Sequence, residues 1–438
     1  MFERTFCSGP WFHIGINYDG SYAKCRWAKD AFSKNENYNV SNTSIIDFYN
    51  SKDMTNLRTE LLTGKKPTVC ETCYYEESYG KLNGRQRQLK KSGIDLGEFN
   101  LTARSSPHYS KFEYSYRNNG ISQYQPTDLQ VWLGNTCNSG CIMCKPLASS
   151  KLEEEYKLLN KLNPKQFEIK EITSWTKDKS QIDSIAEQIC NIQNLGYIHF
   201  LGGETLYDRS FYTLCDRLVE TDNAKNIIVG TTTNGTIYND KLNKYIETFK
   251  EFHLGISIES VTDLNDYIRW PGKISTILPN IEQFLLDREK NENLYLSLRI
   301  TPNIFSVAHI DKLFVFMIEN KIIAESCNIL FDPECLRIEL LPENIRQEMI
   351  VKVKKLIDYY KLTKDHVVNI RVPSIIDQVT ANVILDYYKF LTTYTPPENI
   401  EESRHDLISF IKTFEKSRNN CILDYLPEYE EFLRSYGY

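Results

Sequence analysis

Residues 128–144 read DLQVWLGNTCNSGCIMC and join an apolar, β-rich run directly to three closely spaced cysteines. The run over residues 128–134 predicts a buried strand. Cys137, Cys141 and Cys144 follow it on one short loop, in a C-x3-C-x2-C pattern. With 12 cysteines in the chain, this spacing is expected by chance in on the order of one chain in a hundred. The fold and the chemistry are therefore inferred outward from this stretch.

Further β-rich runs follow the first one and are separated by stretches with apolar residues at i, i+3, i+4 and i+7. Strands are predicted over residues 197–201, 226–231, 253–258, 294–301 and 328–331. Strands that alternate with helices predict a parallel sheet covered by helices. Six such units fit either an open barrel or a doubly wound sheet, and the motifs described below favour an α/β fold with a partial (β/α)6 TIM-like barrel.

The regions outside the predicted barrel differ from it in pattern. Residues 1–104 form an N-terminal module, residues 105–126 a polar, tyrosine-rich connector, residues 127–342 the barrel, and residues 343–438 a helical C-terminal region. Within the module, Phe12, Ile14 and Ile16 alternate with polar residues, and Asp19-Gly20 gives a type I′ turn signal. This pattern predicts a β-hairpin that leads back to Cys25.

Charge and hydropathy exclude several classes of function. The net charge is -6, whereas a nonspecific nucleic-acid binder is normally basic because it neutralises phosphates. No apolar run approaches the roughly 18 residues that span a bilayer, and the first residues lack the pattern of a signal peptide. We therefore expect a cytoplasmic protein with reduced cysteines that binds neither nucleic acid nor membrane.

The three cysteines of residues 137–144 suit an iron–sulfur cluster with one open position. Three thiolates can bind three irons of a cubane cluster and leave the fourth iron without a protein ligand. An open metal position is where a substrate or cofactor can be activated. Structural zinc is the alternative, but it usually needs a fourth protein ligand, and the loop contains no histidine.

The motifs that follow the predicted strands resemble those of the radical S-adenosylmethionine (SAM) superfamily. All of them except the YIRWPG segment lie at the carboxyl end of a predicted strand, the face on which barrels of this kind gather their reactive groups. Taken alone, such motifs could equally be tight turns or solvated loops without a function. The motifs are Gly202-Gly203-Glu204, Thr232-Thr233-Asn234-Gly235, Ser257-Ile258-Glu259-Ser260, the YIRWPG segment of residues 267–272, and Thr301-Pro302-Asn303.

The resemblance implies a role for each group in binding SAM. It implies that Gly202, Gly203 and Glu204 hold the methionine amino group and that Ser257 and Glu259 lie near the ribose. Arg269 is suited to pair with an anionic group, and Asn234 and Asn303 complete the implied cofactor site. Two positions depart from the family pattern: Met143 stands where an aromatic residue is usual, and Glu259 stands where Asp is usual.

A second cysteine group resembles the accessory-cluster module called twitch, a shortened SPASM domain. It consists of Cys7, Cys25, Cys70 and Cys73, and it lies ahead of the barrel instead of after it. Four thiolates can fill all four irons of an auxiliary [4Fe-4S] cluster, which then suits electron transfer. Zinc held by the same thiolates is the alternative, and the neighbouring radical SAM motifs favour the cluster.

The resemblance also implies a mechanism and partners. A flavodoxin-type or ferredoxin-type donor reduces the cluster, SAM is cleaved to a 5′-deoxyadenosyl radical, and the radical abstracts hydrogen from an unactivated C–H bond. A peptide or a small polar metabolite is the expected substrate. Cys327 or Cys335 could return a hydrogen atom to the substrate, although a buried thiol is the simpler interpretation. The alternative of another class is a non-enzymatic metal-binding or interaction protein with structural zinc.

Overall fold

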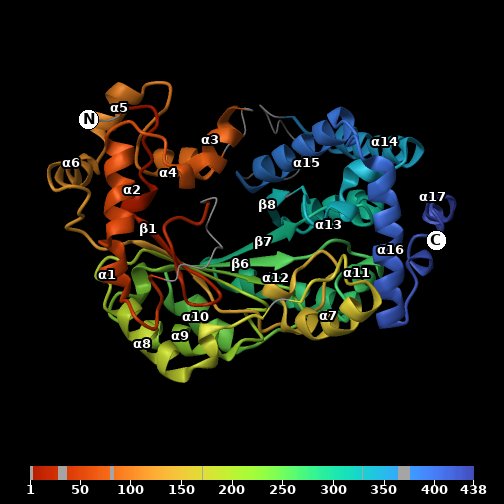
Figure 1. The fold of residues 1–438 in the computed structure, drawn as a ribbon, viewed down its shortest axis with the longest axis horizontal. Helices are drawn as coiled ribbons and strands as arrows, with labels where there is room; N and C mark the ends of the chain where they lie inside the picture. Colours follow the sequence, from red (N-terminus) through yellow and green to blue (C-terminus); the bar gives the residue numbers. More distant parts are fainter. Residues whose placement is uncertain (1–2, 28–36, 79–82, 170, 328, 364–374) are drawn as a thin grey trace.

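The computed structural model describes residues 3–27, 37–78, 83–169, 171–327, 329–363 and 375–438 of the chain. An eight-stranded sheet forms its centre, in the order β2-β1-β3-β4-β5-β6-β7-β8 (Figure 1). β1 pairs with β2 in an antiparallel manner, and the other neighbours are parallel. The strands are β1 His13–Ile16, β2 Tyr22–Ala23, β3 Asp128–Trp132, β4 Tyr197–Leu201, β5 Ile228–Thr233, β6 Glu251–Ser257, β7 Leu294–Ile300 and β8 Ile323–Cys327.

The prediction of an α/β fold with a partial barrel is confirmed. In the described part of the chain, the edge strands β2 and β8 do not pair with each other, so the barrel stays open. Side chains alternate along each strand: Leu129 and Val131 are buried in the main core, whereas Gln130 between them lines a cavity. The strands therefore bury one face under helices and present the other to the interior of the open barrel.

Helices surround the sheet in three groups. Figure 1 shows the N-terminal helices and the C-terminal helices at opposite ends of the sheet. The N-terminal group is α1 Ile45–Tyr49, α2 Lys52–Leu62, α3 Glu71–Ser78, α4 Gly84–Lys91, α5 Phe99–Ser105 and α6 Tyr109–Arg117. The barrel helices are α7 Ser150–Leu162, α8 Lys179–Cys190, α9 Arg209–Val219, α10 Lys241–Thr248, α11 Leu264–Ile268, α12 Ile274–Lys290 and α13 Ile310–Glu319.

The C-terminal region is helical, as predicted. Its helices are α14 Glu343–Tyr360, α15 Ile375–Thr393, α16 Ile400–Arg418 and α17 Glu430–Ser435. α15 packs against β8, and α16 packs against α7. None of the helices in the described ranges has the length and apolarity needed to traverse a lipid bilayer.

The predicted N-terminal hairpin is present and belongs to the main sheet. Ile16 pairs with Tyr22 across the turn, and Gly20 has the positive φ of +83° that such a turn favours in glycine. β1 also pairs in parallel with β3, with Ile14 opposite Leu129. The hairpin thus extends the barrel sheet at one edge and places the segment after β2, which contains Cys25, beside the barrel.

Two predicted segments differ from the structure. The strand predicted over residues 328–331 is wrong for its described residues 329–331, because the last strand is β8, Ile323–Cys327. Helix α13 ends at Glu319, and Lys321 takes a left-handed conformation with φ 53°, so the chain turns into the strand earlier. Residues 105–126, predicted to be a polar connector, contain helix α6, which buries Phe112.

Candidate active site

The cysteine loop of residues 137–144 is fixed by hydrogen bonds from several elements. The Gly140 N–H donates to the Trp270 carbonyl at 2.6 Å, and the Ile142 N–H donates to the Ile268 carbonyl at 2.9 Å. Ser149, the N-cap of α7, donates its hydroxyl to the Ser139 carbonyl at 2.6 Å. Because both sides of the loop are held, its three thiols have fixed positions.

The three thiols face one cavity with a volume of about 450 Å³. Side chains from the carboxyl ends of several strands line the same cavity. Besides Cys137, Cys141 and Cys144, the lining includes Ser139, Gly202, Gly203, Glu204, Thr233, Asn234, Ser257, Arg269 and Thr301. The structure therefore brings together residues that the sequence places in six separate motifs.

The thiols of this loop differ in acidity. Burial raises the pKa of the Cys137 thiol to about 12. The hydrogen bond between Cys144 and Cys141 lowers the pKa of Cys141 and raises that of Cys144, and the Arg269 guanidinium also lowers the pKa of Cys141. Thiolates are the form that binds metal, so bound iron would compensate for the burial, and the smaller mutual repulsion, that keep the Cys137 thiol neutral.

The Gly202-Gly203-Glu204 turn after β4 packs directly on the cysteine loop. The Gly203 N–H donates to the Gly134 carbonyl at 3.0 Å, and the Glu204 N–H donates to the Thr136 carbonyl at 2.8 Å. A Cβ at Gly203 would lie 2.3 Å from the Thr136 carbonyl oxygen. This close backbone approach explains why the position requires glycine.

Glu204 lies buried beneath this turn, with 1% of its surface exposed. Its carboxylate accepts hydrogen bonds from the Thr233 hydroxyl at 2.6 Å and from the Leu206 N–H at 3.0 Å. Burial raises its pKa to about 7, and these hydrogen bonds oppose the shift. Near neutral pH, the carboxylate is therefore able to take up or release a proton.

Asn234 links the turn after β5 to the cysteine loop. Its Nδ2 donates to Asn138 Oδ1 at 2.8 Å and to the Ser139 hydroxyl at 2.9 Å. Gly235, the next residue, has φ +75°, which glycine adopts without strain. The TTNG sequence thus supplies both a tight turn and an anchor for the loop.

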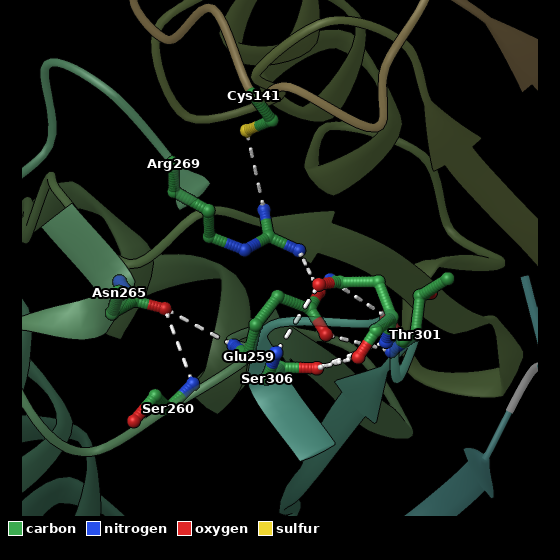
Figure 2. A network of polar contacts seen from close by, with 8 residues as sticks. Cys141, Glu259, Ser260, Asn265, Arg269, Thr301 and Ser306 are labelled. Carbon is green, nitrogen blue, oxygen red and sulfur yellow. Dashed lines mark hydrogen bonds and ion pairs between the residues drawn. The ribbon is translucent and has the colours of Figure 1, made fainter. Parts of the chain in front are cut away.

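Figure 2 shows a polar network between Cys141 and the end of β7. The Arg269 guanidinium donates to Glu259 at 2.6 Å and lies 3.6 Å from Cys141 Sγ. The second oxygen of Glu259 accepts the Thr301 N–H at 2.9 Å. Burial raises the pKa of Glu259 to about 7, and the nearby Arg269 opposes that shift. Glu259 holds Arg269 in place but is not itself among the cavity-lining residues.

Asn303 has a different local role in the structure. Its Oδ1 accepts the Phe305 N–H at 3.1 Å and the Ser306 N–H at 3.2 Å. These bonds close the turn after β7, and Asn303 does not line the cavity. Thr301, two residues earlier, does line it.

Several cavity residues lie outside the motifs that the sequence singled out. They are interior-facing strand positions, among them Gln130, His199 and Arg299. The Tyr197 hydroxyl lies 3.1 Å from His199 Nδ1, and burial lowers the pKa of His199 to about 3. The period-two alternation of the strands was the signal that could have identified them.

The second cysteine group forms a separate cluster of thiols in the N-terminal module. Cys70 lies in the turn Thr68–Cys70, and Cys73 lies in α3. Burial raises the pKa of the Cys7 thiol to about 12 and that of Cys25 to about 11. Burial also raises the pKa of Cys70, and the Cys7, Cys25 and Cys73 thiols raise it further.

In the described ranges, no three His, Cys, Asp or Glu side chains converge on a position for a single metal ion. A cubane cluster does not require such convergence, because each thiolate binds a different iron. The three thiols that share the large cavity fit a cluster with one open iron. The four mutually repelling thiols of the N-terminal module fit a fully ligated cluster. The side chain of Cys327 lies outside the described part, and Cys335 is buried.

Comparison with known families identifies two domains. The radical SAM superfamily model matches residues 133–285. A SPASM model, described as an iron-sulfur cluster-binding domain, matches residues 7–74, a range that contains all four cysteines of the N-terminal group. A search of curated proteins found no match to the sequence.

Among solved structures, the chain is similar to Streptococcus suis SuiB bound to S-adenosylmethionine, with TM-score 0.35 and 14% identity, over 71% of this chain and 64% of SuiB. SuiB bound to the precursor peptide SuiA gives TM-score 0.36 and 15% identity, over 71% and 63% of the two chains. anSMEcpe with bound AdoMet and Cp18Cys peptide gives TM-score 0.36 and 16% identity, over 53% and 59%. The chain thus spans less than two thirds of each of these three structures.

The two domain matches decide between the cofactors that the sequence left open. A radical SAM domain uses SAM and a [4Fe-4S] cluster, and the SPASM match assigns an auxiliary iron–sulfur cluster, not zinc, to the N-terminal module. The thiol groups of the structure fit both assignments. The chain contains a radical SAM superfamily domain over residues 133–285 and, ahead of it, a SPASM iron–sulfur cluster-binding domain over residues 7–74.

Proposed function

We propose that the chain reductively cleaves SAM and uses the resulting radical to abstract hydrogen from an unactivated C–H bond of a substrate held inside the open barrel. The observation that carries this proposal is the 450 Å³ cavity. It joins three thiols that fit a cluster with one open iron to polar groups from four strand ends. A structural metal site has no need of such a cavity.

The cofactors supply the radical chemistry, and the protein supplies orientation and exclusion of water. We assign Cys137, Cys141 and Cys144 to the cluster. Gly202 and Gly203 let the backbone of this turn pack closely on the cysteine loop, and Glu204 supplies a buried carboxylate for the methionine amino group.

Further polar groups of the cavity are assigned to the remainder of SAM. Ser257 lines the cavity and is suited to the ribose. Glu259 orients Arg269, whose guanidinium is available to a carboxylate, because its Nε is buried without a hydrogen-bond partner in the described part. Asn234 and Asn303 act on the site by fixing the turns that surround it.

We propose a peptide or a small polar metabolite as the substrate. The interior wall below the SAM site carries hydrogen-bonding groups, including Gln130, His199 and Arg299. A second cavity of about 180 Å³ continues along this wall and shares His199 and Arg299 with the first. Buried hydrogen-bonding groups of this kind need partners, which amide, hydroxyl or carboxyl groups of a substrate can supply.

The four thiolates of Cys7, Cys25, Cys70 and Cys73 are assigned to the auxiliary cluster. When all four irons have protein ligands, a cluster suits electron transfer and not direct binding of substrate. We propose that it accepts the electron left on the product radical, so that the net reaction is an oxidation. A flavodoxin-type or ferredoxin-type protein is the proposed donor.

Anaerobic reconstitution tests the proposal. We expect a brown protein with about eight irons per chain, as two cubane clusters require, and release of 5′-deoxyadenosine that depends on dithionite. Candidate peptides and polar metabolites that fit the interior should increase this release. A colourless protein, or a brown protein that does not cleave SAM, would contradict the proposal.

A further inference from the structure

A buried arginine of the C-terminal region contacts the cysteine loop. Arg418 is the last residue of α16, and its side chain is 1% exposed. Its Nη2 donates to the Gly140 carbonyl oxygen at 2.5 Å. Residue 418 lies outside the range that the radical SAM model matches, so this contact is a feature of this chain's own C-terminal region.

Gly140, which lies between the first two cysteines of the loop, has both of its backbone polar groups hydrogen-bonded. The Gly140 N–H donates to the Trp270 carbonyl at 2.6 Å, while its carbonyl accepts from Arg418. The Arg418 guanidinium also lies over the Trp270 ring, 4.9 Å from its centroid. A Cβ at Gly140 would lie 3.4 Å from both Arg418 Nη2 and Glu155 Oε2. The backbone of the loop is thus held on both sides at this residue.

Glu155 of α7 is the charge partner of Arg418. Arg418 Nε and Nη2 donate to the two carboxylate oxygens at 2.9 Å and 2.7 Å. The neighbouring Ser417 hydroxyl donates to the same carboxylate at 2.9 Å. The carboxylate is also buried, with its side chain 7% exposed. Burying two charges is costly in general, so such a pair is weak support for stability alone.

One nitrogen of the Arg418 guanidinium makes no hydrogen bond within the described part of the chain. Arg418 Nη1 is buried and has no hydrogen-bond partner among the described residues. Its charge acts in an environment of low dielectric constant, where charge interactions are stronger than in water. A cation beside a cluster stabilises the electron that reduction adds, and a buried anion destabilises it.

From this arrangement we infer that Arg418 is a positioning residue for the cluster loop and that the Arg418–Glu155 pair sets the reduction potential of the cluster held by Cys137, Cys141 and Cys144. The inference rests on the proposed function, because it assumes that this loop holds a redox-active cluster. It gives the C-terminal helices a role in catalysis through the loop and not through contact with substrate.

Two variants, one that removes the positive charge of the pair and one that removes the negative charge, test the inference on the anaerobically reconstituted full chain. Potentials are measured by EPR-monitored redox titration, and iron is counted for each protein. Arg418→Met leaves Glu155 unpaired and should make the potential more negative. Glu155→Gln leaves the cation unpaired and should make it more positive. We expect each change to alter the ratio of reduced to oxidised cluster about tenfold at a fixed potential, equivalent to 59 mV for one electron.

Matched variants separate charge from general loosening. Arg434→Met removes an arginine of the exposed pair with Glu430 on α17, whose side chains are 61% and 55% exposed, and should leave the potential unchanged. Arg418→Lys keeps the charge but cannot donate to both oxygens in the same way, so its potential should fall between those of the wild type and Arg418→Met. If Arg418→Met fails to fold, Arg418→Lys and Glu155→Gln still test the expected negative and positive shifts of the reduction potential.

The inference is overturned if the variants keep full iron and the wild-type potential, or if both charge changes move the potential in the same direction. These outcomes differ from failure of the proposed function. A wild-type chain without a reducible cluster would contradict both. A wild-type chain with a reducible cluster and SAM cleavage, but with variants of unchanged potential, would contradict only the role of Arg418 and Glu155.

Discussion

Glu204 Oε2 accepts the backbone N–H of Asn234 at 2.5 Å, so the turn after β4 is tied to the turn after β5. Asn234 in turn donates its side-chain amide to the cysteine loop. One buried carboxylate thus connects the two motif-bearing turns, and its neighbour Asn234 connects them to the thiols. The site is therefore a single network, in which a change at one motif acts on the others.

The raised pKa of Glu204 predicts that SAM binding depends on pH. Burial raises its pKa to about 7, and we expect the methionine amino group to donate to the ionised form of this carboxylate. A proton therefore competes with SAM below about pH 7, where we expect the Kd to rise by up to about tenfold per pH unit. Above about pH 8 the Kd should level off. Equilibrium binding to the reconstituted protein between about pH 6 and about pH 8.5 measures this.

Glu204→Gln is the control for that dependence. The amide cannot titrate, so the Kd should be weaker overall and its pH dependence should be smaller across the same range. Glu259 has a raised pKa as well, so we expect a smaller pH dependence to remain in Glu204→Gln. A Glu204→Gln protein with the wild-type slope would show that Glu204 does not set the pH dependence.

The Glu259–Arg269 pair predicts a large cost for neutralising its carboxylate. Glu259 is 1% exposed and bonds both Arg269 and the Thr301 N–H. Removing one partner of a buried pair costs about 3–5 kcal/mol, so Glu259→Gln should lower the free energy of unfolding by that amount at about pH 8. Glu259→Asp is one methylene shorter and should cost less, because it can keep one of the two contacts.

An exposed ion pair provides the comparison for Glu259. Glu113 accepts from Arg117 at 2.8 Å on α6, with the arginine side chain 71% exposed. Such surface pairs are worth about 0–1 kcal/mol, so Glu113→Gln should change the free energy of unfolding little. Chemical unfolding of all three variants under one condition measures the difference. Equal costs at the two sites would mean that Glu259 is not a buried structural partner of Arg269.

The sequence predicted the parts of the site that depend on short-range pattern. The cysteine loop, the glycine turns and the strand-end motifs can be located because each follows a β-rich run, and parallel strands bring their carboxyl ends to one face. The departure at Glu259 also has a physical explanation in the structure. A glutamate is long enough to reach both Arg269 and the Thr301 N–H.

The remaining parts depend on contacts that no local pattern encodes. Arg418 meets Gly140 across a sequence separation of 278 residues, and nothing in the sequence around it indicates a partner. The early start of β8 follows from the left-handed turn at Lys321, a conformation that lysine rarely adopts. Helix α6 was missed because its buried residues contact other parts of the module: Ser115 accepts from Trp11 Nε1 at 2.8 Å.

Replacing cysteines of the two groups is expected to affect different activities. Replacing Cys137, Cys141 or Cys144 with Ala should abolish 5′-deoxyadenosine formation, because the SAM-binding cluster loses a ligand. Replacing Cys7 or Cys70 should spare SAM cleavage more than product formation. In each case we expect the loss of up to about four of about eight irons, one cubane cluster. Iron analysis and 5′-deoxyadenosine assays on the same preparations measure both effects.

Cys190→Ala is the matched control for these cysteine variants. Cys190 is partly buried at the end of α8 and does not line the cavity that the cysteine loop faces. Its replacement should leave iron content and SAM cleavage unchanged. If Cys7→Ala or Cys70→Ala abolished SAM cleavage as completely as Cys137→Ala while retaining four irons, the division of labour between the clusters would be wrong.

Two glycines that flank β4 predict opposite responses to a single added methyl group. At Gly203 a Cβ would lie 2.3 Å from the Thr136 carbonyl oxygen and 2.7 Å from that of Asn135. Backbone would have to move, at the point where the turn packs on the cysteine loop. Gly203→Ala should therefore cost about 2–3 kcal/mol in the free energy of unfolding and reduce both iron content and SAM affinity.

At Gly196, before the same strand, a Cβ would meet only the Thr127 carbonyl oxygen, at an ordinary 3.8 Å. Neither glycine has a positive φ, so alanine can adopt both backbone conformations, and the difference lies in contact alone. Gly196→Ala should change the free energy of unfolding by no more than about 1 kcal/mol, and a stabilising sign is allowed because alanine restricts the unfolded chain. Chemical unfolding and iron analysis compare the two variants. Equal changes in the free energy of unfolding and in iron content would show that the Gly203 turn does not pack tightly on the cysteine loop. That result would contradict the role proposed for this turn in the SAM site.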